Sequence, residues 1–436
     1  MATKKELIEA QGFSRRRLLS AFTGGAPGGK ELEPAKPLRA VAAGIALTAM
    51  LLLGGLFFGM LRPGLPQGWE NNRLIIATDT GARYVSVEGV LHPVINTASA
   101  RLLIPAKEFS VVSTDKGTLE GIEVGAPIGI LGAPDDLPAP GSLHNTGWTA
   151  CVDQDAGAAV SVAATSIATA QPGAGVVVRR DGDLFVIAGG LRYAVPADEA
   201  DAVLRGAGLG TAGITRVDGR WLNLFPPGRN LSPIVLRDVG TRIPDSDLVA
   251  GEIVHVQGRP ADERYVITSR GEAAPLTPLA FQLYLLGSGA TAGPEREVTP
   301  AELAALPTGS PAGGDDWPAE PLTALAEPLA ACALLDDEGR TVLAATDVEL
   351  PADRARPAVA VGSGALVRVG DGEAAAHVLV DESGTAYAIP DGAEAVDRLG
   401  YTTDQAGPVP ESWLAYFAGG PALAIDAAGR TPASDG

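Results

Sequence analysis

Histidine and cysteine, the side chains that most often hold transition metals or act as nucleophiles, are scarce in this sequence. Four histidines and two cysteines occur among its 436 residues. The histidines are His92, His144, His255 and His377. They lie far apart, without the i, i+4 spacing of a metal-binding helix, and no Gly-x-Ser-x-Gly motif of a hydrolase occurs. The sequence therefore predicts no catalytic residue, no metal site and no bound cofactor.

A complete nucleotide-binding loop is also missing. Residues 24–30 (GGAPGGK) match the glycines and lysine of a P-loop, but Glu31 stands where Ser or Thr would hold Mg²⁺. A working loop needs a helix after it, whereas Pro34 and Pro37 would interrupt one here. We interpret the segment as a flexible tether, with nucleotide hydrolysis as the enzymatic alternative.

Aromatic side chains make up only 5% of the chain, whereas glycine and proline are abundant, at 55 and 34 residues. This composition favours many short elements joined by turns over long helices. The formal charge is −19, but eight of the 33 basic residues crowd into residues 1–39, beside only four acidic ones. The remaining chain is strongly acidic, which argues against nucleic acid as a partner because it would repel phosphate backbones.

One long uncharged run interrupts this pattern. Residues 40–61 (AVAAGIALTAMLLLGGLFFGML) carry no charge, and as a helix they would extend about 33 Å, enough to cross a hydrocarbon core. The basic residues lie before the run, so the positive-inside rule places the N-terminus in the cytoplasm and the large C-terminal body outside, in the periplasm. We expect a single-pass protein of the cell (inner) membrane.

The sequence SRRRLL at residues 14–19 offers an alternative, because it is similar to a twin-arginine export signal that would be cleaved. The apolar run is longer than such signals use, and RPGLPQGW follows it in place of a small-residue cleavage site. A retained anchor is favoured.

Four segments of the body share an apolar pair, a glycine turn and a second alternating apolar stretch, which predicts four β-hairpins. They are residues 74–87, 184–196, 264–278 and 377–390. The second and fourth continue into similar short helical segments, which indicates internal duplication and a pseudo-twofold body. Thr299 and Glu302 are expected to cap a short helix, and residues 336–339 (DDEG) to form a solvated hairpin turn.

Cys151 and Cys332 are the only cysteines, and they occupy corresponding places in the two halves. On the topology above both lie outside the membrane, where disulfides persist. A bridge between the halves is favoured, and two free buried thiols are the alternative.

Several longer motifs now point to a known family. They are GVLHPVINTASARLLI at 89–104, IGILGAPDDLP at 128–138 ahead of GWTACVD, TPAELAALPTGS, and VPESWLAYFAGGPAL at 409–423. With these motifs, which cover nearly the whole chain, the sequence resembles EccB, a membrane component of the actinobacterial type VII (ESX) secretion system. The N-terminal segment departs from the family by a glycine-rich insert.

The resemblance implies a mainly β fold with short helices: one transmembrane helix, then an elongated extracytoplasmic body of four repeat domains around a β-rich core, bridged by Cys151 and Cys332. The expected domains are a basic cytosolic segment (1–38), the span (39–62), repeat 1 (63–104), a core segment with Cys151 (105–172), repeat 2 (173–212), a core segment (213–258), repeat 3 (259–290), a linker and core segment with Cys332 (291–361), repeat 4 (362–402) and a C-terminal core segment (403–436).

The function that the resemblance implies is that of a structural subunit, whose outer body oligomerises around the secretion channel. The implied partners are EccC, the motor ATPase, with EccD and EccE, in a hexameric inner-membrane complex. Two alternatives remain: an ATPase component of the same system, as described for the family, and a cell-wall module that binds peptidoglycan.

Overall fold

The computed structural model describes residues 3–24, 37–61, 64–153, 157–370, 372 and 375–432. The chain divides into two compact units, Met1–Leu65 and Pro66–Gly436. The first unit contains two helices, α1 (Lys4–Gly24) and α2 (Pro37–Leu61). The P-loop-like segment lies outside the described residues, apart from its first glycine, which ends α1.

The apolar run expected to cross a membrane lies wholly within α2, which is 25 residues long. Over the side chains that the structure describes in this helix, the large apolar ones, such as Ile45 and Leu51, are exposed. Taking the described residues alone, we find no helix that combines the length and the apolar character of a membrane span. The span therefore is not confirmed and stays a prediction.

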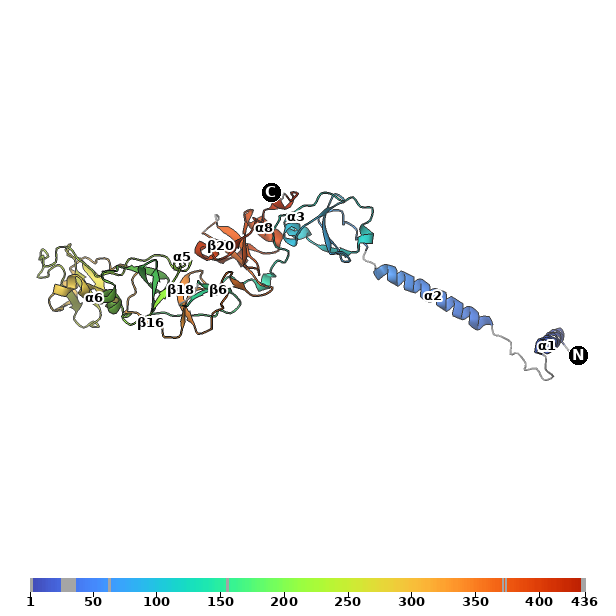
Figure 1. Ribbon diagram of the computed structural model, residues 1–436, viewed down its shortest axis with the longest axis horizontal. Helices are drawn as coiled ribbons and strands as arrows, with labels where there is room; N and C mark the ends of the chain where they lie inside the picture. Colours follow the sequence, from blue (N-terminus) through green and yellow to red (C-terminus); the bar gives the residue numbers. More distant parts are fainter. Residues whose placement is uncertain are drawn as a thin grey trace. The chain divides into compact units, whose positions relative to one another are not determined.

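The second unit is mainly β, with short helices, as expected (Figure 1). It contains four sheets of one common design. In each, three consecutive strands form an antiparallel meander and a later strand adds parallel to the first of them. Sheet 1 contains β1 (Leu74–Ala77), β2 (Ala82–Val87), β3 (Val90–Pro93) and β4 (Val111–Thr114). Sheet 2 contains β8 (Ala174–Arg180), β9 (Asp183–Ala188), β10 (Leu191–Val195), β11 (Ile214–Arg216) and β16 (Thr323–Ala324).

Sheets 3 and 4 repeat this order later in the chain. Sheet 3 contains β12 (Ile253–Val256), β13 (Arg264–Ile267), β14 (Ala273–Leu276) and β15 (Arg296–Val298). Sheet 4 contains β20 (Ala365–Val369), β21 (Ala376–Val380), β22 (Thr385–Ile389), β23 (Gly407–Pro408) and β24 (Ala418–Gly419). The four predicted hairpins are confirmed as β1–β2, β9–β10, β13–β14 and β21–β22. Each sheet also takes a strand from outside the predicted repeat segments, and the domain bounds stay a prediction.

A helix follows the third strand of every one of these sheets. These helices are α3 (Thr97–Leu103), α4 (Ala200–Gly206), α6 (Pro278–Leu286) and α8 (Gly392–Leu399). Capping side chains fix where two of them begin: Asn96 accepts a hydrogen bond from the amide of Ser99, and Thr277 accepts one from the amide of Ala280. The expected helical segments after the second and fourth hairpins are α4 and α8.

These helices pack against one another in pairs, and each pair joins two sheets. Leu102 of α3 and Val396 of α8 share one buried cluster, and these two helices lie side by side (Figure 1). Val203 of α4 and Leu283 of α6 share another. Sheet 1 is thus joined to sheet 4, and sheet 3 to sheet 2, by burial of apolar side chains.

A fifth sheet has six strands and combines residues from two distant parts of the sequence. Its order is β19-β6-β5-β17-β18-β7. The strands are β5 (Thr149–Val152), β6 (Ala159–Val162), β7 (Thr169–Ala170), β17 (Ala330–Leu335), β18 (Thr341–Thr346) and β19 (Ala358–Val359). Its core cluster also includes Val178 of sheet 2 and Val367 of sheet 4, so this central sheet links the two pairs.

Candidate functional site

The centre of the six-stranded sheet carries the one covalent cross-link of the chain. Cys151 of β5 and Cys332 of β17 are directly opposite in antiparallel register and form a disulfide, with their Cα atoms 4.0 Å apart. Both are fully buried, and the small side chains of Ala168 and Ala344 pack in the same cluster as the two sulfur atoms. The expected bridge between the two halves is confirmed.

Aromatic packing reinforces the same centre. The rings of Trp148 and Trp413 lie 6.2 Å apart in an edge-to-face arrangement, and Phe417 lies 5.2 Å from Trp148. The indole nitrogen of Trp413 donates a hydrogen bond of 2.9 Å to the hydroxyl of Thr341 in β18. The last part of the chain is thereby fastened to the central sheet.

The sequence interpretation missed a turn that occurs twice, and both copies pack against this sheet in the same core cluster. Residues 217–225 (VDGRWLNLF) and 409–417 (VPESWLAYF) follow equivalent strands, and each contains a four-residue helix, α5 (Gly219–Leu222) or α9 (Glu411–Leu414). The amide of Val217 donates a hydrogen bond of 3.1 Å to the backbone carbonyl of Arg179 in sheet 2. The amide of Val409 donates one of 3.0 Å to the backbone carbonyl of Arg368 in sheet 4, so the two turns occupy matching places.

The fully buried Trp221 and Trp413 are the central residues of these two turns. The indole of Trp221 donates to the carbonyl of Ala150 in β5, at 2.8 Å. The signal that could have identified the repeat is the pattern V-x-x-x-W-L-x-x-F, which recurs 192 positions later in the sequence.

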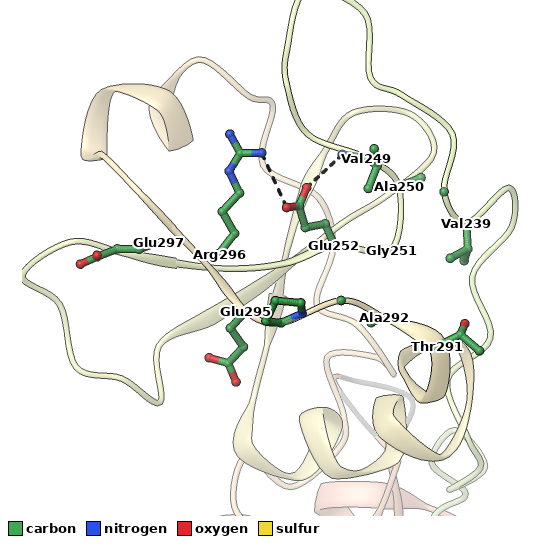
Figure 2. Close-up of a pocket in the computed structure, with 13 residues that line it drawn as sticks. Val239, Val249, Ala250, Gly251, Glu252, Thr291, Ala292, Glu295, Arg296 and Glu297 are labelled. Atoms are coloured by element: carbon green, nitrogen blue, oxygen red, sulfur yellow. Dashed lines mark hydrogen bonds and ion pairs between the residues drawn. The ribbon is translucent and has the colours of Figure 1, made fainter.

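A separate pocket of about 530 Å³ lies in sheet 3, between the segment 249–252 and the segment 291–297 (Figure 2). Glu252 and Arg296 point toward one another across it, with 3.7 Å between carboxylate and guanidinium, while Glu295 and Glu297 point away. Glu252 also accepts a hydrogen bond of 3.1 Å from the amide of Val249, and Arg296 donates to the carbonyl of Asp247 at 3.1 Å.

The charged groups of this pocket connect the loops that form it. Both charged groups in its centre, Glu252 and Arg296, are already paired. The rest of its lining consists of glycine, proline and small apolar side chains, together with Thr291, Glu295 and Glu297. The residues that line it include no hydroxyl or thiol beside a base, which is the arrangement that activates a nucleophile. Sequence reasoning missed the Glu252–Arg296 pair because its members lie 44 positions apart in segments without a motif.

The histidines remain dispersed in the folded chain. His92, His255 and His377 lie in three different sheets, on β3, β12 and β21, and His144 lies in the segment before β5. Nδ1 of His92 lies 3.1 Å from the carbonyl of Ala126. Within the described ranges, histidine, cysteine, aspartate and glutamate side chains form no group of three or more that could hold a metal ion.

The acidic motifs have structural roles. Asp336 accepts hydrogen bonds from the amides of Glu338 and Arg340 in the turn between β17 and β18, which confirms the predicted hairpin turn. The predicted helix cap is also present, because Thr299 and Glu302 form a capping box at the start of α7 (Pro300–Ala304).

Asp135 joins the segment after sheet 1 to that sheet's strand β2 and to helix α3. It pairs with Arg83 and accepts a hydrogen bond of 3.1 Å from the amide of Thr97. The hydrogen bond from Arg83, opposed in part by burial, holds the pKa of the Asp135 carboxyl below its usual value. Elsewhere burial, with a smaller effect of Asp316, raises the pKa of Tyr193 to about 12.

These features define a class of protein: a β-rich scaffold of repeated small sheets, clamped at its centre by one disulfide. The chain belongs to the family described as "Type VII secretion system ESX-1, transport TM domain B" (EccB), whose family model matches residues 1–432.

Curated relatives agree with this assignment. The "ESX-3 secretion system ATPase EccB3" of Mycolicibacterium smegmatis is 30% identical over 449 residues, covering 88% of this chain and 82% of the relative. The protein of the same name in Mycobacterium tuberculosis strain H37Rv is 30% identical over 270 residues, which is 58% of this chain. That match spans 44% of the length of the relative.

Two solved structures share the fold. A chain of an intact ESX-5 inner membrane complex superposes with a TM-score of 0.65 at 21% identity, covering 100% of this chain and 98% of that chain. A chain of the EccB3 dimer from the ESX-3 core complex gives 0.64 at 24% identity, covering 82% of this chain and 99% of that chain. At these identities the likeness establishes the fold.

Proposed function

We propose that this protein is a structural subunit of a type VII secretion complex in the inner membrane. The observation that carries the proposal is the bridge between Cys151 and Cys332, at the centre of a sheet into which both halves of the body pack. A clamped body of this kind keeps a fixed surface while partners bind to it. Membership of the EccB family supports the same role.

The proposed topology is a single membrane crossing by α2, with the N-terminus in the cytoplasm and residues 66–436 outside. A helix of 25 residues extends about 38 Å, which matches the thickness of a bilayer core with some tilt. The three consecutive arginines Arg15, Arg16 and Arg17 lie in α1, on the side that the positive-inside rule assigns to the cytoplasm.

The proposed body has four repeat domains around the central sheet, related in two halves by a pseudo-twofold axis. The common strand order of sheets 1 to 4 supports this division. The turns at 217–225 and 409–417 also support it, because each follows a strand that pairs parallel with the first strand of a sheet and donates a hydrogen bond to that first strand.

The proposed partners are further copies of this chain and subunits similar to EccC, EccD and EccE. Two solved structures of the same fold are part of an inner membrane complex and of a dimer, which supports assembly as the mode of action. The oligomer proposed from the resemblance is a hexamer. Its substrates would be proteins exported through the channel.

Deletion of residues 66–436, with α1 and α2 retained, tests the proposal in cells that secrete through this system. We expect secretion to stop while the truncated chain remains in the membrane fraction. Full-length protein expressed at the same level is the control. Secretion that continues unchanged without the body would reject the structural role.

ATP hydrolysis is the second candidate function, because several relatives are named as secretion system ATPases. It predicts nucleotide hydrolysis by the purified full chain, with loss of activity in Lys30→Ala if residues 24–30 bind phosphate. Activity that survives this substitution would place nucleotide binding elsewhere in the chain. A peptidoglycan sedimentation assay with the full chain tests the third candidate, a cell-wall module.

A further inference from the structure

A small cavity of about 80 Å³ lies beside the central sheet, where four parts of the chain meet. It is lined by the start of β6, by the turn that carries α5, by residues 354–357 and by Tyr416 of the second repeated turn. Its volume is several times the roughly 10–15 Å³ that one water needs. It is far below the roughly 300 Å³ at which pockets for drug-sized ligands begin. Only a small chemical group fits.

Three arginines and one carboxylate line this cavity. The residues are Arg220, Arg354, Arg356 and Asp218. Arg354 is engaged in fixed contacts: its guanidinium donates to the carboxylate of Asp153 at 3.0 Å and to the carbonyl of Gly157 at 2.9 Å. Arg354 therefore forms part of the cavity wall, and its guanidinium is not available to a ligand.

Asp218 is engaged as well, since one of its carboxylate oxygens caps α5 by accepting the amide of Trp221 at 2.8 Å. Arg220 and Arg356 differ, because neither forms an ion pair with any carboxylate among the described residues. Both residues are exposed to solvent, so their guanidinium groups are open to a ligand at this cavity.

The hydroxyl of Tyr416 is buried at this cavity and has no hydrogen-bond partner within the described part of the chain. Burial, with a smaller effect of Asp218, raises the pKa of Tyr416 well above its usual value, so the group stays protonated and can donate. A buried hydroxyl without a partner costs free energy, and such groups in native proteins call for an explanation.

The corresponding position of the first repeated turn holds an apolar side chain without a hydroxyl. Tyr416 occupies the position of Leu224 in the first turn, which is 1% exposed and packs in the same core cluster. The tryptophan and phenylalanine of the turn are kept in both copies, and only this position exchanges an apolar side chain for one with a donor.

We propose that this cavity binds one small oxyanion, a phosphate or a carboxylate group, between Arg220, Arg356 and the Tyr416 hydroxyl. Guanidinium groups suit this ligand because their N–H groups match the oxygen spacing of carboxylate and phosphate. The tyrosine supplies a neutral donor between the two charges. An anion held here connects α5, the 354–357 segment and the end of the second turn, and so stabilises the junction of the two halves.

The test uses the full-length chain in detergent micelles, with inorganic phosphate in one arm and acetate in the other. Binding is measured by calorimetry and by the rise in unfolding temperature, with sodium chloride at equal ionic strength as the reference. We expect saturable binding of at least one anion to the wild type. The arm that gives the tighter binding identifies the ligand as phosphate or carboxylate.

Tyr416→Phe and Arg356→Ala are the informative variants, and Arg259→Ala, an exposed arginine elsewhere, is the matched control. We expect each informative variant to bind about tenfold more weakly, and the control to bind as the wild type does. Tyr416→Phe should fold as well as the wild type without anion, because it removes a donor that has no partner. Absence of saturable binding, or equal binding by all three variants, would overturn the proposal.

Discussion

Cys151 and Cys332 face each other across β5 and β17 in antiparallel register, 181 positions apart in the sequence, and their disulfide is fully buried beside Ala344. The bridge joins strands that belong to different halves of the chain. It therefore restricts the unfolded chain, and this loss of conformational entropy in the unfolded state favours the folded state.

Replacing both cysteines by alanine is expected to lower the free energy of unfolding by about 2–5 kcal/mol, in line with native disulfides that close long loops. Alanine is chosen because the neighbouring core residues are alanines and the strands can stay paired. Denaturant unfolding of the full chain, compared with the wild type under reducing and non-reducing conditions, measures the effect. A double variant as stable as the oxidised wild type would show that the bridge adds nothing.

Trp413→Phe is expected to destabilise the protein by about 2–4 kcal/mol. The substitution leaves a cavity beside Trp148 and removes the hydrogen bond to the buried Thr341 hydroxyl. Thermal unfolding checks this, with Trp69→Phe in a half-buried turn as the matched control. Equal unfolding temperatures for the two variants would contradict the role given to the repeated turn.

Gly208 and Gly400 end equivalent helices, α4 and α8, and both have a positive φ, +82° and +98°. Alanine at either position would be strained by about 1–3 kcal/mol. At Gly208 an added Cβ would also lie 2.3 Å from the backbone carbonyl of Leu322, whereas at Gly400 it meets only the end of the Arg101 side chain. We expect Gly208→Ala to be the more destabilising in urea unfolding. The reverse order would show that the helix ends are not equivalent.

Asp135 gives a prediction with a defined pH dependence. Because Arg83 lowers its pKa in the folded state, the carboxylate adds stability above the ordinary value of 3.8, and this is lost as pH falls through the lower folded value. The pair is partly exposed, so Asp135→Asn should cost less than about 1 kcal/mol at pH 7. The difference from the wild type should vanish in strong acid.

Urea unfolding of wild type and Asp135→Asn at several pH values measures this dependence, with the exposed Asp262→Asn as the control. A difference that is constant across the acid range, or that grows toward low pH, would contradict the assigned interaction.

Much of this fold could be predicted because its hairpin strands follow a local sequence pattern. The four hairpins were identifiable from alternating apolar residues around glycine turns, and Gly81 and Gly271 indeed adopt the positive φ that such turns need. The strands that complete the sheets were missed. Strands β4 and β11 are three or four residues long, and they pair with partners that lie 30 or more positions away, so no local pattern marks them.

One candidate site could be predicted from a local feature of the sequence, and the other could not. The cysteine pair could be predicted because the chain has only two, in matching places. The cavity at Tyr416 could not, because Arg220, Arg356 and Tyr416 come from three segments that are far apart in the sequence and meet only in the folded chain. Long-range strand pairing, rather than a motif, brings these side chains together.

Purification of the intact membrane complex tests the central claim, that this chain is a structural subunit, most directly. The full-length chain with a C-terminal tag is extracted from cells in mild detergent, and its size is compared with that of a chain lacking residues 66–436. We expect the full-length chain to migrate in one large assembly with other secretion subunits and the truncated chain not to do so. A full-length chain that migrates alone, while the secretion complex assembles without it, would show that the chain is not a structural subunit of that complex.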